Sequence, residues 1–165
     1  MAVNERLSEL LRQRGAACEV VPHRETFTSQ EVAQASHLSG RSVAKVVVLR
    51  DEMRDFLMAV LPASEHIEIE ALRRITGRDQ LEIAGEEDLR RLFPDCELGA
   101  MPPFGNLYGL PLFVDPCLRE HDIWFQAGNH HEIARMSFET YSRLARPYVG
   151  AAARVRKPLR RGSSG

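Results

Sequence analysis

The sequence predicts a single-domain α/β protein of the mixed α+β type, in which helices pack around one mixed, mostly antiparallel sheet. Three observations predict this fold class. The 165 residues are the length of one domain, and 44% of them are hydrophobic, which is enough to form a buried core. Short apolar segments typical of strands interleave with amphipathic segments typical of helices. They do so without the strict strand-helix alternation of a parallel sheet.

The first expected elements are a helix, a short strand and a second helix. Leucines recur at helical spacing over residues 4–14, and the apolar residues of 17–21 follow as a strand. Thr28 and Glu31 have the spacing of a capping box, in which each side chain bonds the backbone N–H of the other residue. A helix is therefore expected from this point to Leu38.

Two successive strands form the expected centre of the sheet. Residues 42–50 and 56–61 are apolar at successive positions, and the polar residues 51–55 connect them. Strands that are apolar on both faces are buried on both sides. A connection this short joins antiparallel neighbours.

The remainder of the chain continues to mix helices and strands. Apolar spacing, acidic first turns and glycine or proline stops predict the helices, and alternating or continuous apolar runs predict the strands. The expected helices cover 69–75, 86–92 and 137–144, and the expected strands cover 80–84, 110–114 and 122–126.

Charge is unevenly distributed along the chain. Residues 1–153 contain 17 basic and 23 acidic residues, a net charge of −6, whereas the end of the chain has five basic residues and no acidic one, namely Arg154, Arg156, Lys157, Arg160 and Arg161. We therefore expect a folded domain over 1–150 and a basic flexible tail over 151–165. The tail is either solvated or in contact with RNA phosphates. The acidic body argues against broad, nonspecific binding of nucleic acid.

Several other classes of protein are not expected. The N-terminus has no apolar signal region, and no run approaches the about 18 apolar residues that cross a bilayer, so we expect a cytoplasmic protein without a membrane partner. Cys18, Cys96 and Cys117 are widely spaced without a CxxC pair, which predicts reduced thiols. Histidines and cysteines form no closed set of zinc ligands, and glycine-rich nucleotide motifs are absent, so neither a metal nor a cofactor is expected.

Lys45 is the first candidate functional residue. It shares a strand face with Val43, Val47 and Leu49, in a segment whose other face is also apolar. Burial of an ammonium group is costly unless an anionic group meets it. Two interpretations remain open. Lys45 binds a phosphate or an oxygen that gains negative charge, or its side chain reaches water from the end of the strand.

Two glycine-containing segments are further candidates. Gly99–Gly105 has two prolines and two glycines in seven residues, so it continues neither a helix nor a strand. Its backbone either surrounds an anion or carbonyl group or serves only as a connection. In the turn Gly128–His131, either one histidine hydrogen-bonds a ligand or both lie in solvent. Glu132 completes an H-x-E motif, but no P-C-x-x-C follows, so a zinc deaminase site is not expected.

Taken together, these three segments resemble the YbaK/ProX family. This family comprises free-standing aminoacyl-tRNA deacylases and the related editing domain of bacterial prolyl-tRNA synthetases. The similar features are Lys45 in Val43-Ala-Lys-Val-Val-Val-Leu49, the GxxxP loop Gly99-Ala-Met-Pro-Pro103 followed by Phe104-Gly105, and Gly128-Asn-His130. Their order and spacing match, and the resemblance spans about residues 4–148.

The resemblance implies a mixed β-sheet core surrounded by helices. It also implies a trans-editing hydrolase that cleaves the ester between a wrong, small amino acid and its tRNA. The implied partners are mischarged aminoacyl-tRNA and an aminoacyl-tRNA synthetase. Val46 departs from the polar residue that often follows the lysine in alanine-editing members, so their amino-acid specificity does not carry over. A non-catalytic module that binds aminoacyl-tRNA or a synthetase is the alternative.

The resemblance further implies which residues form the site. The implied catalytic residues are Lys45, which corresponds to the essential lysine of the family, Gly99 and His130. The implied substrate-binding residues are Ala100, Met101, Pro102, Pro103, Phe104, Gly105, Gly128 and Asn129. We expect the rigid segment from Met101 to Phe104 to form a pocket wall that excludes large aminoacyl groups.

Overall fold

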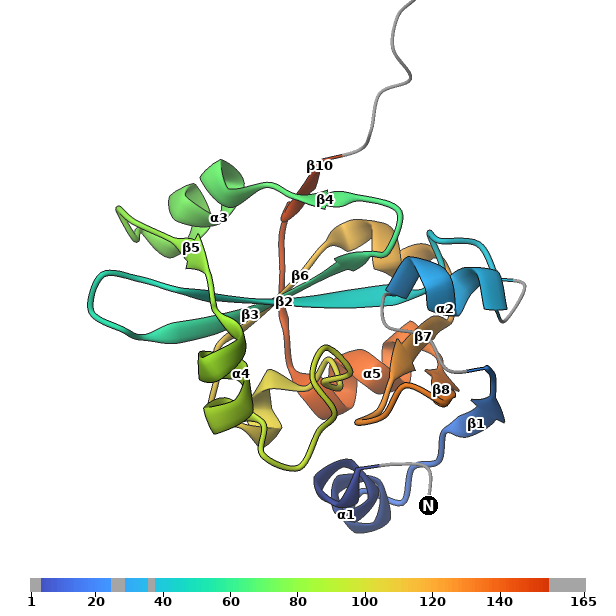
Figure 1. Ribbon diagram of the computed structural model, residues 1–165. Helices are drawn as coiled ribbons and strands as arrows, with labels where there is room; N and C mark the ends of the chain where they lie inside the picture. The colour runs from blue at the N-terminus through green and yellow to red at the C-terminus, as the bar shows by residue number, and fades with distance from the viewer. Residues whose placement is uncertain (1–3, 25–28, 36–37, 155–165) are drawn as a thin grey trace, which may run out of the picture.

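A five-stranded mixed sheet forms the centre of the protein in the computed structural model, which describes residues 4–24, 29–35 and 38–154 (Figure 1). Its strand order is β5-β2-β3-β6-β9. The bounds are β2 (Ala44–Arg50), β3 (Phe56–Pro62), β5 (Glu82–Ile83), β6 (Leu112–Val114) and β9 (Tyr148–Val149). The predicted antiparallel pair is confirmed, since β2 and β3 pair from Ala44 opposite Pro62 to Arg50 opposite Phe56. Strand β3 is the middle strand, and six of its seven residues are buried.

The strands belong to three sheets rather than to the single sheet that the sequence predicts. A second, antiparallel sheet has the order β1-β8-β7, with β1 (Glu19–Pro22), β7 (Ile123–Gln126) and β8 (Glu132–Met136). The third pairs β4 (His66–Ile67) with β10 (Ala153–Arg154). The second sheet is separate because β7 pairs with β8 across the turn at Gly128, and a parallel bridge between Val43 and Trp124 connects it to the first sheet.

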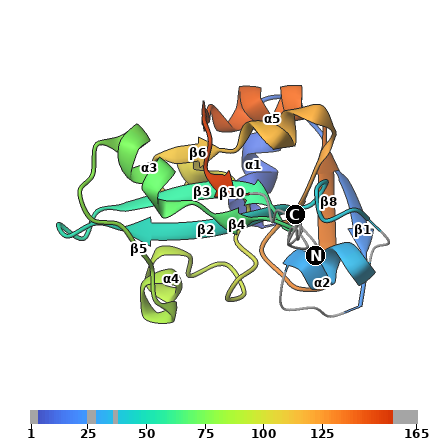
Figure 2. The same ribbon diagram turned by 90° about the horizontal axis from the view of Figure 1, so that it is seen from above.

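The five predicted helices are confirmed, and they surround the β2–β3 pair (Figure 2). Their bounds are α1 (Glu5–Gln13), α2 (Ser29–Ala35), α3 (Ile69–Thr76), α4 (Glu86–Leu92) and α5 (Phe138–Ala145), with two 3-10 turns at η1 (Gly105–Leu107) and η2 (Pro116–Glu120). The expected capping box of α2 includes Thr28, which lies outside the described residues. Within the described ranges, no helix is both long and apolar enough to cross a membrane.

Local sequence explains where these helices begin and end. The side chain of Asn4 accepts hydrogen bonds from the first turn of α1, and Ser137 accepts one from Thr140 N at the start of α5. Gly77 ends α3 in the left-handed conformation, at φ 68°. These caps satisfy backbone groups that a helix end otherwise leaves without partners.

The two faces of β2 pack into different parts of the core. Ala44 and Val48 belong to the largest apolar cluster, which also contains Leu7 of α1 and Tyr141 of α5. Leu49, on the other face, packs in a cluster with Leu72 of α3. A strand buried on both faces in this way is rigid, and it therefore fixes the position of Lys45.

The folded body extends beyond the predicted boundary at residue 150. Ala152 is completely buried, its N–H donates to Asp115 Oδ2 at 3.0 Å, and its carbonyl accepts from Glu68 N at 2.8 Å. The next two residues pair with β4. Residues 151–154, assigned to the tail from their sequence, thus continue the domain, because Ala152 is buried and hydrogen-bonded and residues 153 and 154 form strand β10. The remaining basic tail lies outside the described residues.

Candidate functional site

Lys45 is the second residue of β2, and a hydrogen bond holds its side chain in place. Its Nζ donates to the main-chain oxygen of Glu65 at 2.5 Å, and the side chain is half-buried. Burial lowers the pKa of the ammonium group, and the nearby carboxylate of Glu65 only partly opposes this shift. The lysine therefore carries a charge that water stabilises incompletely, which suits the binding of an anion or a polarised oxygen.

Glu65 belongs to an acidic cluster that the sequence did not reveal. Only 4% of its surface is exposed, and its Oε2 has no hydrogen-bond partner in the described part of the chain. Ligand atoms of Glu65, Asp115 and Cys117 lie within 4.8 Å of one another. Burial raises the pKa of Glu65, Asp115 raises it further, and Arg41 and Lys45 oppose the shift. Glu65 is distant in the chain from Asp115 and Cys117, so no spacing motif could have identified the cluster.

The loop Gly99–Gly105 is a rigid part of the core. The side chains of Met101 and Phe104 are buried in the largest apolar cluster, and Tyr141 donates its hydroxyl to Pro103 O at 2.6 Å. A Cβ on Gly105 would lie 2.7 Å from the carbonyl oxygen of Leu110, so only glycine fits there. The side chains of Met101 and Phe104 therefore face the core, and a pocket wall formed by this segment, which stays a prediction, would be made by its backbone.

His130 joins this loop to the turn after β7. The ring is buried, with Nε2 2.7 Å from Leu98 O and Nδ1 3.3 Å from the amide nitrogen of Gln126. Because a carbonyl only accepts, we assign the ring proton to Nε2, and Nδ1 then accepts from Gln126. Both ring nitrogens are therefore engaged within the protein. This arrangement suits a positioning role better than proton transfer.

Main-chain hydrogen bonds complete the connection between the loop and the turn. Gly128 N donates to Ala100 O and Glu97 N donates to Gly128 O, each at 2.8 Å. Gly99 and Gly128 have φ angles of 86° and 110°, which favour glycine. Asn129 Oδ1 accepts from His131 N at 2.8 Å and stabilises the turn locally. The predicted loop and turn thus form one hydrogen-bonded unit.

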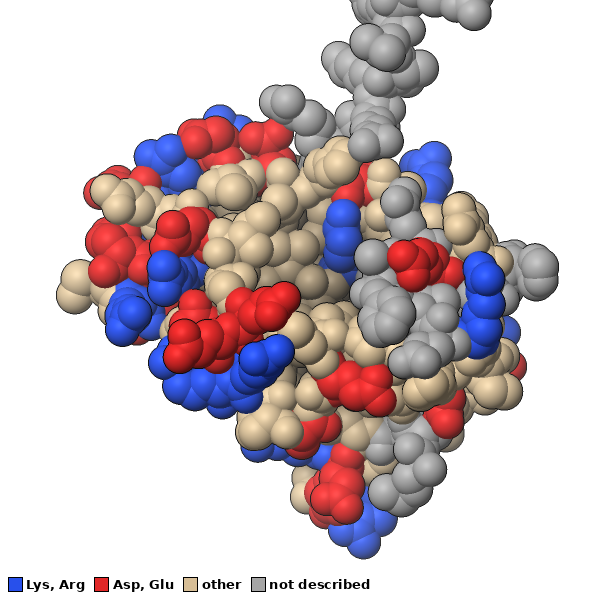
Figure 3. All heavy atoms as spheres, in the orientation of Figure 1, with Lys and Arg blue, Asp and Glu red and all other residues tan. Residues whose placement is uncertain are grey.

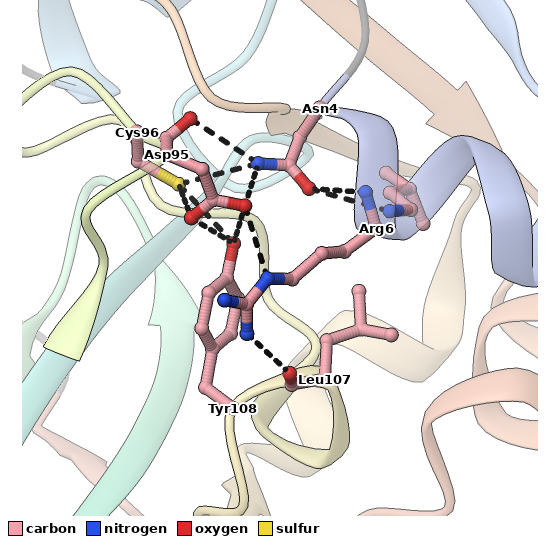
Figure 4. A network of polar contacts seen from close by, with 7 residues as sticks. Asn4, Arg6, Asp95, Cys96, Leu107 and Tyr108 are labelled. Atoms are coloured by element: carbon pink, nitrogen blue, oxygen red, sulfur yellow. Dashed lines mark hydrogen bonds and ion pairs between the residues drawn. The ribbon is translucent and has the colours of Figure 1, made fainter.

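A polar network supports this unit from the N-terminus (Figure 4). Asn4 Nδ2 donates to Asp95 Oδ2 at 2.7 Å, and Asn4 N donates to Ala127 O at 2.8 Å. The guanidinium of Arg6 lies over the ring of Tyr108, 4.7 Å from its centre, and pairs with Asp95 at 3.2 Å. These contacts attach α1 to the segment that precedes the loop.

The same network holds one of the three cysteines, all of which are free thiols as predicted. Cys96 Sγ lies 3.3 Å from the hydroxyl of Tyr108. Burial raises the pKa of Cys96 to about 11. This thiol is therefore protonated and unreactive near neutral pH.

The segment that carries Lys45 and the strand that leads into the turn meet at one bridge between two sheets. Val43, two residues before Lys45, bridges Trp124 of β7. The last residue of β7, Gln126, contacts His130. A separate surface hollow of about 390 Å³ lies at the other end of β2, where Arg50, Ile69 and Leu81 contribute to its lining, and it contains none of the predicted site residues. The candidate site is therefore the junction and not this hollow.

Comparison with known proteins identifies the family. Residues 23–144 match the family model described as "Aminoacyl-tRNA editing domain". Over 149 residues the chain is 28% identical to the Multifunctional Ser/Thr-tRNA deacylase ProXp-y of Escherichia coli (strain K12), and the match covers 87% of this chain and 89% of that protein.

Solved structures share the fold. The structure of hypothetical protein APE2540 matches with a TM-score of 0.81 and 18% identity, over 91% of this chain and all of that chain. A structure described as a candidate trans-editing enzyme for prolyl tRNA synthetase matches with a TM-score of 0.79 and 23% identity, over 92% and 96% of the two chains. Because the family model covers well over half of the sequence, and the mixed α+β fold agrees with it, the chain belongs to the aminoacyl-tRNA editing domain family, of the YbaK/ProX type.

Proposed function

We propose that this protein is a trans-editing deacylase that hydrolyses the ester of a mischarged tRNA carrying a small amino acid. The half-buried ammonium of Lys45, which donates to Glu65 O, is the observation that carries this proposal. Family membership supports the reaction class. The relative named as a Ser/Thr-tRNA deacylase supports a small aminoacyl group.

The chemistry needs little beyond positioning and charge. Water adds to the ester carbonyl carbon, and the carbonyl oxygen becomes an oxyanion. The bond to the ribose oxygen then breaks, this oxygen takes up the proton that the water loses, and the amino acid and the tRNA are released. An ammonium group in a site with little water stabilises that oxyanion strongly. The vicinal hydroxyl of the ribose is suitably placed to orient the water. No protein nucleophile is required.

Lys45 is a better oxyanion ligand than the loop. Ala100 N already donates to Glu97 O at 3.0 Å, Phe104 N donates to Pro102 O at 2.8 Å, and the two prolines have no N–H. We therefore assign the ester carbonyl to Lys45. The loop–turn unit contributes a rigid backbone surface that fixes the size of the aminoacyl group.

Recognition of tRNA does not require a broad basic surface in this proposal. Acidic and basic side chains are interspersed over the face shown in Figure 3. The terminal adenosine and its ester therefore supply the specific contacts, and an aminoacyl-tRNA synthetase is a further proposed partner. We expect the basic residues from 156 onward to add contacts with phosphates.

A panel of mischarged tRNAs tests the function. We expect the purified protein to release free serine, threonine or alanine from their esters at least about tenfold faster than phenylalanine from the same tRNA, because a rigid pocket excludes the larger group. Release of free amino acid is measured, with the spontaneous rate subtracted. Binding of the tRNAs without turnover would instead support a non-catalytic binding module, and equal rates for serine and phenylalanine would contradict size exclusion.

Activity is expected to survive removal of metal ions. The proposed reaction uses an ammonium group rather than a Lewis acid, so dialysis against EDTA should change the rate by less than about twofold. The measurement compares deacylation before and after chelation. Loss of activity that added zinc restores would contradict the proposed mechanism.

A further inference from the structure

One carboxylate oxygen of Glu65 has no hydrogen-bond partner among the described residues, although the ammonium of Lys45 lies close by. Lys45 Nζ bonds the main-chain oxygen of Glu65, and Oε2 of the same residue is buried without a hydrogen bond in the described part of the chain. A buried carboxylate is unstable unless a proton or a cation compensates its charge. The structure therefore has an open acceptor directly beside the ammonium that we assign to the ester carbonyl.

Asp115 reinforces the negative charge at this point. Its Oδ1 accepts from Cys117 N at 2.9 Å and its Oδ2 accepts from Ala152 N at 3.0 Å, so backbone contacts fix the carboxylate. Asp115 therefore adds a fixed negative charge beside Glu65, and the two carboxylates together suit a small cationic group.

We propose that Glu65, supported by Asp115, binds the α-ammonium group of the aminoacyl ester. This inference rests on the proposed deacylase function. In such an ester the carbon that bears the ammonium group is bonded directly to the carbonyl carbon. The residue that holds the carbonyl oxygen and the residue that holds the ammonium group must therefore be neighbours, as Lys45 and Glu65 are.

An ammonium group fits this cluster better than a metal ion. The pKa of Cys117 is raised to about 11, chiefly by burial and then by its contact with Asp115, so the thiol is protonated near neutral pH. Arg41 and Lys45 add positive charge close to Glu65. A divalent ion would meet more repulsion here than a single ammonium charge.

The consequence is selection for a free amino group. An N-acylated ester, such as peptidyl-tRNA, has no ammonium charge and would leave the carboxylate uncompensated. Rejection of a ligand that leaves a buried polar group unpaired is a strong source of specificity. The protein should therefore spare tRNAs whose amino group is blocked.

A substrate–variant cycle tests the inference. Seryl-tRNA is compared with its α-hydroxy counterpart, in which deamination has replaced the ammonium group by a hydroxyl. We expect the wild-type preference for seryl-tRNA in kcat/KM to fall by about tenfold to a hundredfold in Glu65→Gln, the factor expected from one hydrogen bond between charged groups. Because this preference is compared between the wild type and Glu65→Gln, the different intrinsic reactivities of the two esters cancel. Glu70→Gln, which neutralises an exposed carboxylate on α3, should retain the wild-type preference.

Binding measured with the wild-type protein alone provides a second test. A non-hydrolysable serylamide of the terminal adenosine should bind at least about tenfold more tightly than its α-hydroxy counterpart. The thermal midpoint of Glu65→Gln should not fall, because the variant removes a buried charge without changing the shape of the side chain.

The outcomes separate the two proposals. An unchanged preference in Glu65→Gln, or equal binding of the two amides, overturns this inference and leaves the deacylase proposal standing. Zinc stabilisation that depends on Cys117 would assign the cluster to a metal and also overturn it. If the wild-type protein hydrolyses no ester in the panel, the deacylase proposal fails and this inference fails with it.

Discussion

Replacing Lys45 by alanine is expected to lower kcat/KM for deacylation roughly a hundredfold, the equivalent of about 3 kcal/mol of transition-state stabilisation. The side chain is half-buried and its Nζ is fixed by Glu65 O. Alanine removes the only group in our mechanism that compensates the charge of the oxyanion. Single-turnover deacylation of a small aminoacyl-tRNA gives the measurement.

The same substitution should alter the free energy of unfolding by less than about 1 kcal/mol. Burial lowers the pKa of Lys45 in the folded protein, so its protonated form opposes folding at neutral pH. That unfavourable contribution is fully present below the lowered pKa and diminishes as the pH rises through it. Loss of the cation therefore offsets loss of the hydrogen bond, and circular dichroism should show a folded variant.

Lys45→Arg makes the test stricter. Arginine retains the charge but replaces a compact ammonium by a broad planar group, which does not fit where one carbonyl oxygen and one main-chain oxygen are held. We expect this variant to be folded and nearly inactive. Arg90→Ala, which removes an exposed cation from α4, serves as the control and should retain activity within about twofold. A fully active Lys45→Ala would contradict the assignment of the ester carbonyl to Lys45.

Replacing His130 by alanine is expected to affect both stability and activity. The variant removes the imidazole that hydrogen-bonds both Leu98 O and the Gln126 side chain in a buried site. This loss should lower the free energy of unfolding by about 2–4 kcal/mol and Tm by roughly 5–12 °C. The Gly99–Gly105 loop and the Gly128–His131 turn then lose the side-chain hydrogen bond that connects them. The substrate is positioned less precisely as a result, so kcat should fall at least about tenfold. Thermal unfolding and deacylation kinetics measure the two effects.

His130→Gln distinguishes positioning from proton transfer. A glutamine amide has a donor group and an acceptor group, as the neutral imidazole does, so its NH2 can donate to Leu98 O while its carbonyl accepts from Gln126. We expect this variant to recover most of the stability and at least about a third of the activity. An amide cannot act as a general base near neutral pH, so a stable but inactive His130→Gln would indicate that the imidazole transfers a proton.

The local conformation of this protein could largely be predicted from its sequence. Helix α4 has the predicted bounds. Helices α1 and α3 end at Gln13 and Thr76, within two residues of Gly15 and Gly77, the glycines that predict these ends. Periodicity and capping act within a few residues, and this is the range over which a sequence pattern is informative. Strand β8 was not predicted. Its residues do not alternate strictly between apolar and polar, and it forms because it pairs with β1 on one side and β7 on the other.

The identity of the site could be predicted only in part. The sequence identifies Lys45, the GxxxP loop and the Gly128–His130 turn as candidates, because glycines and prolines constrain the backbone locally and a lysine among apolar residues is conspicuous. The sequence cannot show that Met101 and Phe104 are buried, or that both ring nitrogens of His130 are engaged. Those facts depend on neighbours that are distant along the chain.

By itself, therefore, the sequence determined the mixed α+β class, the helices, the central β2–β3 pair and the family. Only the tertiary structure decided that the strands form three sheets, that residues 151–154 belong to the domain and that Glu65 meets Asp115 beside Lys45. The physical reason is the range of the forces involved. Backbone preferences and apolar periodicity are set by neighbouring residues, whereas the burial of a charge is set by whichever distant segments pack around it.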